Sequence, residues 1–277
     1  MYIDTHTHIN FNDFKEDGDQ VIRKALSENV WMIIVGTDYK SSKKALNYAN
    51  KYEKGVFAAV GLHPTALMDF YSTKTNRIIK AEEFNNDIYE KLASFDKVVA
   101  IGEIGLDYYY LDRRDDVEAQ KKKQKDVFIK QLILARRLNL PVIIHCRQAH
   151  DDMLKVLSSF RREYKDLMPQ QKCWGVIHCF SGDEDLAWRY FNLGLMISFT
   201  GVITFSNQWD DLIRKAPLEK IMIETDSPFL APEPFRGKRN EPILVKYIAQ
   251  HIADIKNLSV ERIAEATTHN AKMFFNI

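Results

Sequence analysis

The chain has 277 residues, of which 45% are hydrophobic and 28% are charged, and its formal net charge is +1. This composition is typical of a globular protein with a sizeable core, and the near-neutral charge argues against a surface coated in basic residues for bulk nucleic-acid binding. No apolar run is long enough to span a bilayer and no leader-type segment precedes the first motif, so we expect a cytoplasmic protein without membrane association. Three cysteines in or beside apolar runs indicate buried thiols in a reducing compartment.

Short apolar runs with β character recur along the whole chain, and most are continuous, as expected of strands covered on both faces. Eight strands are predicted, at residues 2–8, 30–37, 56–63, 98–107, 141–147, 174–180, 195–201 and 221–226. Helical periodicity follows each of them, at residues 19–29, 41–53, 82–95, 118–139, 151–164, 184–193, 209–215, 243–255 and 260–275.

Eight strands that alternate with helices predict a (β/α)₈ TIM barrel of the metal-dependent hydrolase type, with an open doubly wound sheet as the alternative. The barrel is favoured because polar residues gather at the carboxyl end of nearly every strand rather than at one switch point. No low-complexity linker divides the chain, so we expect residues 1–277 to form a single domain. The segment 65–81 is longer than a usual loop, and we expect it to extend over the active face.

The predicted strands end in residues that bind metal ions. The first ends in His6-Thr7-His8, whose two imidazoles point to one side because side chains alternate along a strand. In a parallel barrel the carboxyl ends of all strands lie on one rim, where active sites of this fold are built. The other strand ends carry His63, Glu103, His145, His178, Glu224 and Asp226. Buried groups of this kind are costly unless they are paired or metal-bound, so their convergence predicts a metal site.

Six of these residues exceed the number of ligands taken by one tetrahedral ion, so we predict two divalent cations that share a bridging carboxylate. Glu103, near the middle of the sequence, is the expected bridge. Several imidazoles favour zinc, manganese, iron or nickel over magnesium, and magnesium, manganese and zinc stay open as the metal. The predicted ligands are His6, His8, Glu103, His145, His178 and Asp226.

Over essentially its full length the chain resembles the TatD-type metal-dependent hydrolases, the TatD deoxyribonuclease family. The resemblance is carried by DTHTH at 4–8, GLHP at 61–64, GEIGLD at 102–107, HCR at 145–147, HCFSG at 178–182, ETDSP at 224–228 and RGKRNEP at 236–242. It implies a (β/α)₈ barrel and metal-dependent DNase activity, including 3′→5′ exonuclease action. It also implies one ion held by His6, His8, Glu103 and Asp226, and a second held by Glu103, His145 and His178.

The sequence departs from the family pattern at two positions. Cys146 follows His145 where the family often has serine, and strand alternation predicts that the thiol points away from the metals. The run Tyr108, Tyr109 and Tyr110 stands near a position where the family often carries a basic residue, which leaves Arg113 and Arg114 as substitutes.

The predicted reaction is attack of a metal-activated water on phosphorus, with Glu103, Asp226 and His63 as catalytic residues. Asp226 is the candidate general base. His63 is expected to contact substrate or protonate the leaving group, with packing beside Pro64 as the alternative. Phosphate contacts are predicted for Arg147, Arg236, Lys238 and Arg239, although residues 236–242 also fit a structural turn.

The leading function is therefore a deoxyribonuclease that acts on DNA or another phosphodiester, with no obligate protein partner. The alternatives are a metal-dependent amidohydrolase, lactonase or esterase acting on a small molecule or aminoacyl-tRNA, and a binding protein with a vestigial site. The complete ligand set argues against the last. Glu224 is expected to orient a ligand, and His150, His251 and His269 are expected at the surface or at helix caps.

Overall fold

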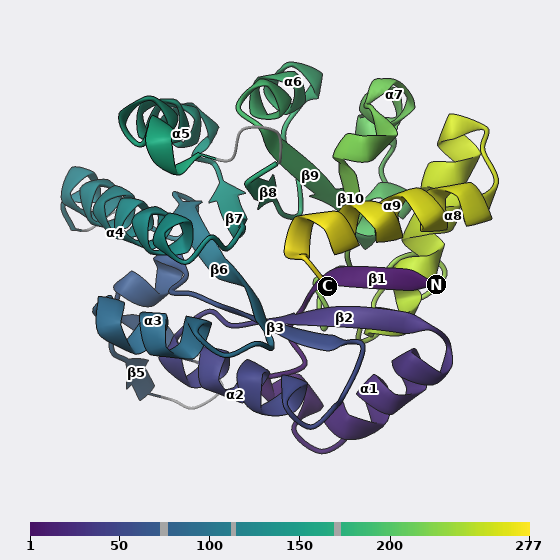
Figure 1. Ribbon diagram of the computed structural model, residues 1–277, viewed down its shortest axis with the longest axis horizontal. Helices are drawn as coiled ribbons and strands as arrows, with labels where there is room; N and C mark the ends of the chain where they lie inside the picture. The colour runs from purple at the N-terminus through teal and green to yellow at the C-terminus, as the bar shows by residue number, and fades with distance from the viewer. Residues whose placement is uncertain (73–76, 112–114, 169–172) are drawn as a thin grey trace.

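The computed structural model describes residues 1–72, 77–111, 115–168 and 173–277. Figure 1 shows strands arranged around a centre with helices outside them. The main sheet is parallel, with the order β1-β2-β3-β6-β7-β8-β9-β10. Its strands are Tyr2–Thr7, Val30–Val35, Val56–Val60, Val98–Asp107, Val142–Arg147, Gly175–Ile177, Leu195–Phe199 and Ile221–Ile223. A single bridge between Thr7 and Ser227 links the two ends of the sheet, so the barrel is nearly closed. The predicted fold class is confirmed.

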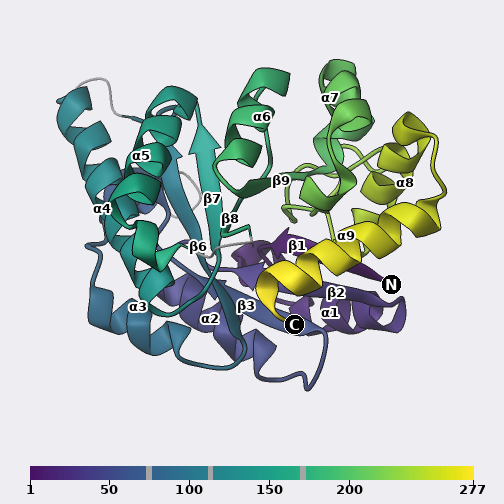
Figure 2. The same ribbon diagram turned by 45° about the horizontal axis from the view of Figure 1, so that its top comes forward.

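The helices form the outer layer of the barrel (Figures 1 and 2). They are α1 Gly18–Ser27, α2 Tyr39–Ala49, α3 Asn86–Ala93, α4 Val117–Arg137, α5 His150–Glu163, α6 Glu184–Asn192, α7 Asp210–Lys215, α8 Val245–Lys256 and α9 Val260–Phe275. All nine predicted helices are present, with boundaries that differ by a few residues. No helix in the described part of the chain is long and apolar enough to cross a bilayer.

The alternation of side chains along the strands divides the core into two parts. On β2, Met32 and Ile34 face the helices, whereas Ile33 and Val35 face the interior of the barrel. Phe275, near the end of α9, is buried with these interior residues. Apolar side chains therefore fill the barrel interior, and the polar strand ends are left to form a site at the rim.

Most strands end before their predicted limits, and the difference matters for the site. Pairing in β3 stops at Val60, three residues before His63, and pairing in β8 stops at Ile177, before His178. His63 and His178 therefore lie in the turns that follow these strands, whereas Glu103 and His145 remain within β6 and β7. The segment 65–81, predicted as a long loop, contains an antiparallel pair formed by β4 (Phe70–Ser72) and β5 (Arg77–Ile79).

Candidate metal centre

The six predicted ligands lie together at the rim of the barrel. His6 and His8 come from β1 and its end, Glu103 from β6 and His145 from β7. Asp226, just after β10, is placed by its backbone N–H, which donates to the carbonyl of His6 at 2.9 Å. Segments that are about 220 residues apart in sequence are thus joined at one site, as strand closure in a barrel requires.

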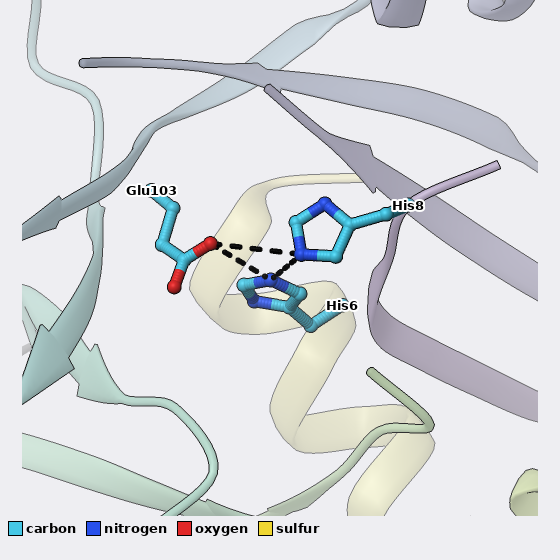
Figure 3. Close-up of side chains that lie close together, drawn as sticks. All are labelled: His6, His8 and Glu103. Atoms are coloured by element: carbon cyan, nitrogen blue, oxygen red, sulfur yellow. Dashed lines mark hydrogen bonds and ion pairs between the residues drawn. The ribbon is translucent and has the colours of Figure 1, made fainter. Parts of the chain in front are cut away.

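Glu103 lies between two groups of imidazoles. Its Oε2 is 3.5 Å from Nε2 of His6 and 3.6 Å from Nε2 of His8, as Figure 3 shows. Its Oε1 is 2.9 Å from Nδ1 of His145 and 2.8 Å from Nε2 of His178. Each oxygen of one carboxylate therefore faces a different set of nitrogens, which is the arrangement that a bridging ligand needs.

Asp226 completes the group around Oε2. Its Oδ1 lies 3.4 Å from Nε2 of His8 and 3.8 Å from Nε2 of His6. Its backbone has a positive φ of 54°, a left-handed conformation that Asp adopts more readily than most residues. The turn after β10 thereby directs this carboxylate back toward the end of β1.

The donor set fits divalent cations. Nε2 of His6 and Nε2 of His8 are 3.1 Å apart, and three ring nitrogens lie within 3.4 Å of the single oxygen Oε1 of Glu103. A neutral imidazole offers one hydrogen-bond donor and one acceptor. Hydrogen bonds alone therefore cannot give every nitrogen and oxygen that converges here a partner of its own. Because all of these groups except His145 are buried, a cation coordinated from several sides would stabilise them together.

His63 lies beside this cluster in a distinct way. The backbone N–H of Thr65 donates to its Nδ1 at 3.2 Å, and its Nε2 is 3.4 Å from Oε1 of Glu103. With Nδ1 acting as an acceptor, the proton of the neutral ring is on Nε2. The ring therefore presents its Nε2–H toward Glu103, and His63, Glu103 and His145 also lie close enough together to hold one metal ion.

Buried carboxylates outside the cluster orient its histidines. Oδ2 of Asp107 lies 2.9 Å from Nε2 of His145. Oε1 of Glu224 lies 3.2 Å from Nδ1 of His178, and Oε2 accepts a hydrogen bond from Ser198 at 2.7 Å. Such partners set the ring orientation and raise the basicity of metal-binding histidines.

Asp107 is a functional candidate that the sequence reasoning did not assign. A signal for it was present, because Asp107 stands four residues after Glu103 on the same strand, where side chains at even spacing share a face.

Asp107→Asn should weaken metal binding by about 10- to 100-fold, because His145 loses its anionic partner. Titration of the metal-free protein with Mn²⁺ measures this effect. Asp126→Asn, on the exposed face of α4, should bind as wild type does, and equal affinities of both variants would contradict the role.

Neighbouring histidines lower the pKa values of two carboxylates in the cluster. Burial by itself raises the pKa of Glu103, but His178, His63 and His145 outweigh it and hold that pKa well below the usual value. Burial likewise raises the pKa of Asp226, and His8 and His6 reverse the shift. Both carboxylates are therefore anionic at neutral pH.

Metal uptake should release protons and should strengthen as pH rises. Burial alone lowers the pKa of His178, but Glu103 and Glu224 raise it well above its ordinary value. In the metal-free protein, protonation of His178 stabilises the fold. This stabilisation is complete below the ordinary pKa of histidine, and it is lost as the pH rises through the raised pKa of His178. A cation must displace the same proton. Calorimetry in buffers of different ionisation heat, between about pH 6 and about pH 8, measures the release, and a pH-independent affinity would count against it.

The four predicted phosphate-binding residues have different surroundings. The guanidinium carbon of Arg147 lies 3.8 Å from the centre of the Tyr109 ring, and that of Arg236 lies 4.4 Å from the Phe205 ring. Nζ of Lys238 is 5.9 Å from the ring of Phe235.

Arg239 is engaged within the protein. Its guanidinium donates to both carboxylate oxygens of Asp17, at 2.9 and 2.6 Å, and to Glu241 at 3.2 Å. This pairing favours the structural turn over a phosphate contact at this position. Arg113 and Arg114 lie outside the described residues.

Cys146 points away from the cluster, as alternation predicts. Its Sγ lies 3.3 Å from Nδ1 of His150, and the same nitrogen is 2.8 Å from the hydroxyl of buried Tyr190. His150, the first residue of α5, is partly buried, and its ring contacts Cys146 and Tyr190 instead of capping the helix. Burial raises the pKa of the Cys146 thiol to about 12, which leaves it protonated and unreactive.

Comparison with known proteins places this geometry in a family. The family model described as TatD related DNase matches residues 3–276. The chain belongs to the TatD family. Its TatD-family relatives include the uncharacterized metal-dependent hydrolase YabD of Bacillus subtilis, which is 36% identical over 280 residues and covers 100% of both chains.

Two further proteins match nearly the whole length of this chain. The uncharacterized metal-dependent hydrolase YcfH of Escherichia coli K12 is 36% identical, with 99% of this chain and 96% of that protein covered. The crystal structure of YjjV, a TatD homologue from E. coli K12, has 28% identity and a TM-score of 0.80, and the match covers 100% of this chain and 98% of that one. The protein is thus a metal-dependent hydrolase of the TatD family, with His and Glu clusters that can bind metal.

Proposed function

We propose that this protein is a deoxyribonuclease that hydrolyses phosphodiester bonds of DNA from the 3′ end, with two divalent cations. The observation that carries the proposal is the position of Glu103, whose two oxygens face separate groups of imidazoles. Two-metal sites of this kind suit in-line displacement at phosphorus. The family description, TatD related DNase, supports DNA as the polymer, and the 3′→5′ direction follows from the resemblance in sequence.

The residues on each side of Glu103 would hold one cation each. His6, His8 and Asp226 lie on one side, and His145 and His178 lie on the other. When bound, such cations lower the pKa of water and offset charge on phosphoryl oxygens.

Asp226 is the residue best placed to accept a proton. Its side chain is 15% exposed, compared with 5% for Glu103, so it borders the space from which substrate and water would approach. His8 and His6 keep it anionic by lowering its pKa against the effect of burial. A carboxylate that is anionic and reachable by water can act as a general base.

His63 is the proposed hydrogen-bond donor to the leaving oxygen. Its side chain is 11% exposed, and its Nε2 proton faces the cluster because Nδ1 accepts from the backbone of Thr65. Burial lowers the pKa of His63, which favours the neutral ring. The neutral ring would donate a hydrogen bond that stabilises the leaving oxygen, and that oxygen would take its proton from water. Arg147, at the exposed end of β7, is the proposed contact to phosphate oxygens outside the reacting centre.

Hydrolysis of 5′-labelled single-stranded DNA tests the proposal. The purified protein, freed of metal with a chelator and then supplied with Mg²⁺, Mn²⁺ or Zn²⁺, should shorten the labelled strand from its 3′ end. RNA, an aminoacyl ester and a lactone are assayed in parallel under the same conditions. Intact DNA beside rapid cleavage of the ester or lactone would instead establish a small-molecule or aminoacyl-tRNA hydrolase.

A further inference from the structure

We infer that two partly exposed aromatic platforms, one on each side of the metal cluster, stack against the two nucleobases that flank the phosphodiester being cut. The tyrosine platform consists of Tyr109 and Tyr110, and the phenylalanine platform consists of Phe11 and Phe229. This inference rests on the proposed function and names how that site holds its substrate.

The tyrosine platform is tied directly to a histidine of the cluster. Oδ2 of Asp107 lies 2.9 Å from His145, while Oδ1 accepts hydrogen bonds from the backbone N–H groups of Tyr109 and Tyr110 at 2.9 and 3.1 Å. One carboxylate therefore positions both the ring of His145 and the turn that carries the two tyrosines.

Arg147 adds a positive charge to this platform. It stands two residues after His145 on β7, so both side chains leave the same face of the strand. Its guanidinium carbon lies 3.8 Å from the centre of the Tyr109 ring and 5.1 Å from that of Tyr110. The tyrosines are 50% and 58% exposed, so ring surface remains open beside a cation, the combination that binds single-stranded nucleic acid.

The phenylalanine platform lies against the opposite group of ligands. The ring of Phe11 stacks on His8, with centroids 4.4 Å apart and planes 8° apart. The ring of Phe229 lies edge-on to both of these rings. Its centroid is 6.3 Å from that of Phe11 and 6.4 Å from that of His8. The backbone N–H of Phe229 also donates to the carbonyl of Asp226 at 3.0 Å. Phe229 is 49% exposed, although it is large and apolar.

The two platforms border opposite ends of the cluster. His8, which carries the phenylalanine platform, faces Oε2 of Glu103, whereas His145, which is linked to the tyrosine platform, faces Oε1. A phosphodiester held over Glu103 has one nucleoside on each side, and each base then meets an aromatic surface. Stacking of this kind tolerates any base because every base has a π-face. The arrangement therefore fits the unpaired end of a DNA strand.

Abasic dinucleotide substrates test the inference. The rate constant kcat/KM is measured with an intact dinucleotide and with two analogues that lack either the 5′ or the 3′ base. The wild-type protein should prefer the intact substrate over each analogue by about tenfold. The double variant Tyr109→Leu and Tyr110→Leu should lose the preference for one base only, and Phe229→Leu should lose the preference for the other.

Matched variants separate stacking from other effects. Tyr109→Phe keeps the ring and should keep both preferences. Trp188→Leu removes an aromatic side chain that is 38% exposed on α6, and should also keep both. Thermal unfolding of each variant shows that it is folded.

Each outcome bears on one of the two proposals. Hydrolysis without a preference for either base, or leucine variants that retain both preferences, would overturn the platforms and leave the deoxyribonuclease function standing. Absence of hydrolysis of any phosphodiester by the metal-loaded wild type would overturn the function, and the platforms with it.

Discussion

Glu103→Gln should lower DNA hydrolysis by more than about 100-fold and should reduce the amount of bound metal. Glutamine has the shape of glutamate, but it carries no charge and one of its two oxygens becomes an N–H₂ donor. In the native site Oε2 faces His6 and His8, and Oε1 faces His145 and His178. The substitution therefore weakens both groups of ligands at once, whereas loss of any one histidine affects one group.

The effect is measured as the rate of single-stranded DNA cleavage and as metal content per protein after dialysis. Glu118→Gln is the matched control, because the Glu118 side chain is 79% exposed in an ion pair with Lys121 on α4. This control should retain both activity and metal. Cleavage by Glu103→Gln at the wild-type rate would sink the prediction, since a contaminating nuclease would then be the better explanation.

Gly105→Ala should destabilise the fold by about 3 to 5 kcal/mol. Gly105 has a φ of +145°, and an added Cβ would lie 2.0 Å from the carbonyl oxygen of His145. The two residues are partners in the ladder between β6 and β7. The clash can be relieved only by separating these strands, which carry Glu103, Asp107 and His145, so metal affinity should fall together with stability.

Gly237→Ala separates the clash from the backbone preference of glycine. Gly237 also has a positive φ, +82°, but nothing lies within 4 Å of an added Cβ. We therefore expect a loss of only about 1 kcal/mol at this position. Urea denaturation of both variants measures the difference, and equal losses would show that the contact with His145 costs nothing.

The barrel could be predicted because its signals are local. The strands are continuous apolar runs, since helices cover one face of the sheet and the packed interior covers the other. The helices are amphipathic segments with a polar outer face. The exact strand ends could not be predicted, because pairing stops where polar residues such as His63 and His178 turn toward the rim, and this depends on neighbouring strands.

The candidate site was predictable only in part. His6, Glu103 and Asp226 were found because each follows or ends an apolar run, and a parallel barrel brings such positions to one rim. The pairing of Arg239 with Asp17 was not foreseen, because the two residues are 222 positions apart. The sequence shows only that Arg239 belongs to a cluster of basic residues. The fold brings the carboxylate of Asp17 into contact with it.

By itself, the sequence predicted which residues could bind metal and determined that their strand ends share one rim, because strand periodicity and the order of elements are local properties of the chain. Only the tertiary structure decided how they are used. It placed the two oxygens of Glu103 against different histidines, assigned Asp107 to His145 and Glu224 to His178, and put aromatic rings at both ends of the cluster. These choices depend on the register and closure of the barrel, which bring distant segments within a few ångströms.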